Sequence, residues 1–76
     1  PLTRINKINV DIPKSTMVKV SVYDMIGKEV EVLVDGQLNA GSYKIDWNAS
    51  KYASGIYFYR ITTSEFTDIK KMVLVK

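Results

Sequence analysis

Apolar and polar residues alternate along most of this chain with the period of a β-strand. Residues 17–24 show the pattern most clearly, in the order Val18, Lys19, Val20, Ser21, Val22 and Tyr23. Because successive side chains of a strand point to opposite faces, the valines are predicted to face a core. A second alternating run, over residues 8–12, ends at Pro13, which cannot donate a hydrogen bond to a sheet.

A hairpin is predicted from residues 18 to 34. Its turn is Asp24–Gly27, because an Asp carboxylate accepts hydrogen bonds from backbone amides and Gly accepts a positive φ. The returning strand, residues 28–34, alternates again. It is expected to point Val30, Val32 and Val34 inward and Glu29, Glu31 and Leu33 outward. Asp35–Gly36 resembles a further turn that extends to Gly41, with Leu38 packing into the core.

The stretch from Gly41 to Arg60 contains the only tryptophan and two Gly-x-Tyr sequences. It predicts one strand with Tyr43, Ile45 and Trp47 facing the core, and a second strand over residues 56–61. On the second strand, Tyr57, Tyr59 and Ile61 share one face, and Ile56, Phe58 and Arg60 share the other. The two Gly-x-Tyr sequences predict strands that begin with the same geometry, and the Tyr57 hydroxyl is expected to bond back to the loop before it.

The last predicted strand, residues 66–75, has no clear inner face. Met72 and Leu74 lie on one side, and Val73 and Val75 on the other. Six or seven short strands without helical periodicity predict an all-β fold, a small immunoglobulin-like antiparallel β-sandwich. The residues expected to shape its turns and core are Asp24, Gly27, Gly41, Tyr43, Trp47, Gly55 and Tyr57.

Composition narrows the function. With 76 residues there is room for a single domain, and the chain starts at Pro1, so we expect a fragment of a longer protein. The absence of His and Cys argues against Ser-His-Asp or Cys-His catalysis and against common zinc sites, and no cofactor is expected. A net charge of +3, spread along the chain, favours a solvated surface over nucleic-acid binding. No apolar run is long enough to span a membrane.

Two groups of residues suggest chemistry, and each also has a structural explanation. Glu29 and Glu31 are expected to share one strand face, where paired carboxylates can perform acid–base chemistry or bind calcium. A solvent-facing pair opposite the valines is the simpler interpretation. Asp46, Trp47 and Asn48 suggest a sugar-binding platform, but the alternation places Trp47 in the core.

Four motifs, in order, resemble one known family. They are Val20–Val30 (VSVYDMIGKEV), Leu38–Tyr43 (LNAGSY), Asp46–Arg60 with its DWN and SGIYFYR segments, and Lys70–Lys76 (KKMVLVK). With these four motifs the chain resembles the C-terminal sorting domain, type A, of the bacterial type IX secretion system. The resemblance covers nearly the whole chain. It departs at the N-terminus, where the family usually opens with an N-P-F-N-P type sequence and this chain has Pro1-Leu2.

The resemblance implies an immunoglobulin-like, non-catalytic domain at the end of an exported protein. Such a domain directs its parent from the periplasm through the outer-membrane translocon to the cell surface or medium. A surface sortase often removes it by cleavage at or before its N-terminus. The implied partners are the type IX secretion machinery and the sortase, without direct membrane insertion.

The last strand is the expected recognition surface. It is terminal and apolar on both faces, so we expect it at a sheet edge where a partner can add a strand. The residues assigned to translocon recognition are Lys70, Lys71, Met72, Val73, Leu74, Val75 and Lys76. Such an edge also suggests a homodimer. The alternative function is a permanent immunoglobulin-like spacer or carbohydrate-binding module of a surface enzyme.

Overall fold

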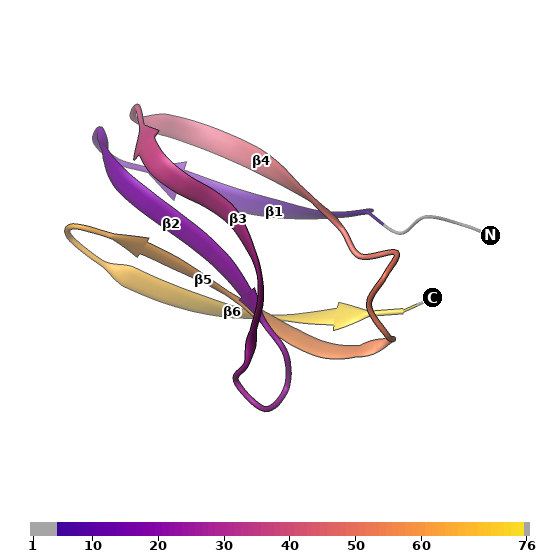
Figure 1. Cartoon of the computed structure of the whole chain (residues 1–76). Helices are drawn as coiled ribbons and strands as arrows, with labels where there is room; N and C mark the ends of the chain where they lie inside the picture. The colour runs from indigo at the N-terminus through magenta and orange to yellow at the C-terminus, as the bar shows by residue number, and fades with distance from the viewer. Residues whose placement is uncertain (1–4, 76) are drawn as a thin grey trace.

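Within residues 5–75, six antiparallel strands form two facing sheets, the small immunoglobulin-like β-sandwich that the alternation predicts. A computed structural model of the chain describes residues 5–75. Figure 1 shows the strands in chain order, and their bounds are β1 Ile5–Ile12, β2 Thr16–Tyr23, β3 Glu29–Leu38, β4 Gly41–Asn48, β5 Gly55–Thr63 and β6 Thr67–Leu74. One sheet contains β1 and β4, and the other has the order β3-β2-β5-β6. Among the described residues, β3 and β6 are therefore the two edges of the larger sheet.

The core lies between the sheets and uses the alternating side chains that the sequence marks. Val18, Val20 and Val22 on β2 are at most 2% exposed, and Trp47 on β4 is fully buried. The other buried apolar residues are Ile8, Val10, Ile12, Ala49, Tyr57, Ile61 and Leu74. The predicted inner faces of β2 and β4 are thus confirmed. The alternating apolar residues of β1 are buried, and on β5 the row that contains Tyr57 and Ile61 is the one that faces the core.

The β2–β3 hairpin turns where expected. The Gly27 amide donates to the Asp24 carbonyl oxygen at 3.0 Å, and Gly27 has a φ of +88°. The Asp24 carboxylate accepts from the amides of Ile26 and Lys28 at 3.1 and 2.9 Å. This side chain therefore satisfies the donors that the turn leaves without sheet partners.

The predicted faces of β3 are partly wrong, because two bulges interrupt its pairing with β2. Val20 lies opposite Val34 but Ser21 lies opposite Val32, so Leu33 is an extra residue; a second shift makes Val30 extra. Each bulge adds one residue to one strand and changes which face the following residues occupy. Leu33 consequently packs against the core, and Val32 is 45% exposed, the reverse of the expectation.

The predicted turn at Asp35–Gly36 is also wrong. β3 continues through both residues, and Gly36 lies opposite Val18 in the ladder. The chain changes sheets only at residues 39–40, because β4 pairs with β1 and not with β3. Leu38 does pack against the core, as expected.

Candidate functional site

The edge strand β6 is the part of the molecule that the sequence assigned to recognition. It pairs with β5 over eight residues without a register shift. The pairing begins with Gly55 opposite Leu74 and ends with Thr62 opposite Thr67. Within residues 5–75 its other side has no strand partner. Lys76, at the end of the assigned segment, lies outside the described residues, as do Pro1 and Leu2.

The structure decides which face of β6 is buried. Leu74 is 2% exposed, and Met72 packs against the core. Ile69, Val73 and Val75 are 58%, 60% and 64% exposed. The last described strand is thus held to the sandwich by one face, and on the other it presents exposed apolar residues on both sides of Lys71.

The four sheet edges differ in what they offer a partner. β3 is bulged twice, and bulges distort an edge so that another strand cannot pair along it. The fully exposed side chains described on β1 and β4 are polar, and the apolar Tyr43 and Ile45 of β4 are only partly exposed, so these edges offer an added strand less apolar surface than β6 does. β6 is regular and lies beside three of the seven large hydrophobic residues exposed in residues 5–75. It is the edge best suited to strand addition.

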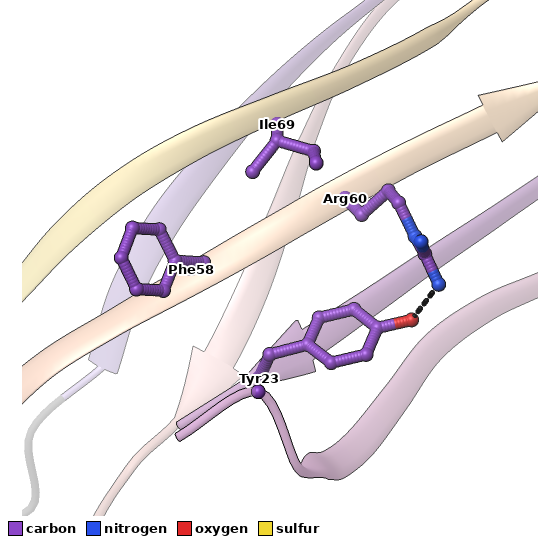
Figure 2. Close-up of a pocket in the computed structure, with 5 residues that line it drawn as sticks. Tyr23, Phe58, Arg60 and Ile69 are labelled. Atoms are coloured by element: carbon purple, nitrogen blue, oxygen red, sulfur yellow. Dashed lines mark hydrogen bonds between the residues drawn. The ribbon is translucent and has the colours of Figure 1, made fainter. Parts of the chain in front are cut away.

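A hollow of about 340 Å³ adjoins β6 on the outer face of the larger sheet. Its lining includes Tyr23 from β2, Phe58 and Arg60 from β5, and Ile69 from β6 (Figure 2). The Arg60 guanidinium lies 4.8 Å from the centre of the Tyr23 ring and donates to the Tyr23 hydroxyl. The hollow therefore combines two apolar side chains with a cation whose position is fixed by stacking.

Glu29 and Glu31 do not form the carboxylate pair that their spacing predicted. The bulge at Val30 separates them. Glu29 lies on the outer face, where the Ser21 hydroxyl and then the Lys19 ammonium, 3.4 Å away, hold the pKa of its carboxyl below the ordinary value. Glu31 instead accepts a 2.8 Å hydrogen bond from the Tyr52 hydroxyl. Shared acid–base chemistry or shared calcium binding by the two carboxylates is excluded by this separation.

The tryptophan is part of an aromatic cluster rather than a sugar platform. The Trp47 ring centre lies 5.4 Å from that of Tyr52 and 5.3 Å from that of Tyr57, the latter in an edge-to-face arrangement. Its neighbour Asp46 is engaged in an ion pair with Lys7 across the smaller sheet. Because Trp47 has no exposed surface, it cannot stack on a ligand in this structure.

The two Gly-x-Tyr sequences do begin their strands in the same way. Gly41 and Gly55 have φ values of +153° and +154°, a backbone conformation that residues with a Cβ rarely adopt. The Tyr43 hydroxyl donates to the Asn39 carbonyl at 2.6 Å, and the Tyr57 hydroxyl donates to the Ala53 carbonyl at 2.7 Å. Each tyrosine closes a loop onto the strand that follows it, which is a structural role.

The acidic side chains of residues 5–75 do not gather around a metal centre. No group of three or more Asp or Glu side chains within residues 5–75 is placed to hold a metal ion. The same part of the chain has no helix that could cross a membrane. Residues 5–75 thus form a folded module in which the outer edge of β6 has no strand partner.

Comparison with known protein families agrees with this description. The family model described as "Secretion system C-terminal sorting domain" matches residues 1–76. Comparisons with curated proteins and with solved structures gave no match. Because the family match covers the whole chain, this protein belongs to the C-terminal sorting domains of the type IX secretion system, which mark proteins for export to the cell surface or extracellular space.

Proposed function

We propose that this domain directs a parent protein from the periplasm through the outer-membrane translocon, and that the machinery recognises residues 70–76. In this proposal the chain is the C-terminal domain of a longer exported protein and performs no catalysis. The family match supports the sorting role, and the free, regular edge of β6 supports the place of recognition. Strand addition to β6 supplies main-chain hydrogen bonds, and the exposed side chains supply selectivity.

Removal of the assigned segment gives the first test. A fluorescent cargo fused to the domain is expected to reach the cell surface or medium in a type IX-competent bacterium and to stay in the periplasm without residues 70–76. A translocon-null strain provides the reference for blocked export. Because this deletion also removes Met72 and Leu74 from the core, it does not separate lost recognition from lost folding.

A second variant keeps the core intact. The triple substitution Ile69→Thr, Val73→Thr and Val75→Thr changes only exposed side chains of the β6 segment. The matched control is Val32→Thr, an exposed valine on the bulged edge β3. We expect the triple variant to lose export while the control keeps it, with both domains folded by circular dichroism. Export of the triple variant at the normal level would refute recognition through β6.

After export, we propose that a surface sortase removes the domain by cleavage at or before its N-terminus. A folded sandwich that carries no chemistry of its own suits a signal that is later discarded. The mass of the C-terminal peptide of the exported parent tests this: a cleaved parent lacks the domain. Retention of residues 1–76 on the mature protein would instead favour a permanent spacer.

A further inference from the structure

The two lysines of β6 determine which strand can pair with its edge. Lys70 lies opposite Tyr59 and Lys71 opposite Phe58, so the two side chains point to opposite faces of the larger sheet. Both are exposed, and within residues 5–75 the one ion pair that either forms is that of Lys70 with Asp68, at 3.9 Å, which joins two exposed groups. Exposed ion pairs of this kind contribute little to the stability of the fold, so Lys70 remains available to another carboxylate.

Resting on the proposed recognition through β6, we infer that its partner is an extended acidic strand with two adjacent carboxylates, one for Lys70 and one for Lys71. Adjacent residues of an added strand point to opposite faces, as the two lysines do. Opposite charges directly across a strand pair stabilise it, and like charges destabilise it. Ile69, Met72 and Val73 require apolar residues at the flanking positions.

The same charges disfavour a second copy of the chain as the partner. If β6 pairs antiparallel with its own copy over all eight residues, Lys70 falls opposite Lys71 twice. Lysine on an edge strand is a common protection against self-association. The acidic partner turns that repulsion into attraction, so the lysines give both protection and specificity. The hollow beside Ile69 adds the Arg60 guanidinium to the positive charge on the outer face.

A designed peptide tests the inference directly. The antiparallel complement of residues 67–74 is Thr-Val-Val-Glu-Glu-Val-Lys-Thr, with the two Glu residues opposite Lys71 and Lys70 and its Lys opposite Asp68. The matched control replaces the two Glu residues with Lys. Binding is followed by the amide chemical shifts of the isotopically labelled chain, which show where each peptide binds as well as how tightly.

We expect the Glu-Glu peptide to shift the amides of β6, to leave β3 unchanged and to bind on the order of tenfold more tightly than the control. In the variant Lys70→Glu/Lys71→Glu the preference is expected to reverse. Binding of the Glu-Glu peptide should weaken as salt increases, because exposed charges are screened. Equal affinity for the two peptides, shifts centred on another edge, or absence of binding by both peptides would overturn the inference.

Self-association provides an independent check. The unaltered chain and the Lys70→Glu/Lys71→Glu variant are each expected to sediment as monomers, whereas their equimolar mixture should associate because the charges opposite one another are then of opposite sign. A dimer of the unaltered chain as strong as that of the mixture would contradict the inference.

The cellular experiment separates this inference from the function on which it rests. Loss of export in the Ile69→Thr, Val73→Thr and Val75→Thr variant, together with unchanged export of Lys70→Glu/Lys71→Glu, would refute only the acidic partner. Unchanged export of both variants would refute recognition through β6 itself.

Discussion

The Tyr57 hydroxyl donates a 2.7 Å hydrogen bond to the carbonyl oxygen of Ala53, four residues earlier in the chain. Because this bond is partly buried, Tyr57→Phe leaves the Ala53 carbonyl without its partner. We expect a loss of about 1–2 kcal/mol in the free energy of unfolding. Urea denaturation measures it.

The equivalent bond from Tyr43 to Asn39 is exposed and serves as the comparison. Tyr43→Phe should cost less, under about 1 kcal/mol, because water can solvate the freed carbonyl. Equal losses of unfolding free energy in the two variants would show that burial of the hydrogen bond does not change its contribution to stability.

The bulges of β3 predict opposite effects for two neighbouring residues. Leu33 packs against the core and Val32 is exposed, so Leu33→Ala should destabilise by about 1–3 kcal/mol and Val32→Ala by no more than about 0.5 kcal/mol. Thermal unfolding of the two variants decides between this register and the uninterrupted alternation, which predicts the reverse order.

The Tyr52 hydroxyl links the loop after β4 to β3, through Glu31 at 2.8 Å and the Val30 carbonyl at 3.0 Å. Burial, followed by the hydrogen bond to Glu31, raises the pKa of Tyr52 to about 12. A raised pKa in the folded state means that this stabilisation is complete below the unfolded pKa of about 10. It is lost as the pH rises towards about 12.

Tyr52→Phe should therefore be less stable than the unaltered chain at neutral pH and should lose less stability between about pH 10 and pH 12. Both expectations are checked by measuring the free energy of unfolding of the two proteins at neutral pH and between about pH 10 and pH 12. Identical pH profiles for the two proteins would show that Tyr52 does not contribute.

The two faces of β6 predict separable effects on stability. Leu74 is 2% exposed, so Leu74→Ala should cost about 2–4 kcal/mol, a large part of the stability of so small a domain. Val73 is 60% exposed, and Val73→Ala should cost no more than about 0.5 kcal/mol. A comparable loss from both would mean that Val73 is packed in the folded chain.

The strands whose alternation is regular could be predicted from the sequence alone. Val18, Val20 and Val22 mark the inner face of β2, and Trp47 marks that of β4, because burial of one face requires one apolar residue at every second position. The Asp24–Gly27 turn and the two Gly-x-Tyr loops were also predictable, since each depends on contacts within a few residues.

The faces of β3 and β6 and the partner of β4 could not be predicted in this way, because they depend on how the strands pack together. A bulge is a property of two paired strands, so the sequence of β3 alone does not show that Leu33, rather than Val32, faces the core. The apolar residues at 72–75 satisfy either face, and only packing against the opposite sheet selects Met72 and Leu74. The proposed recognition depends on the edge of β6 that has no strand partner within residues 5–75. This edge follows from the order of the strands in the sheet, which is set by contacts between residues distant in the sequence.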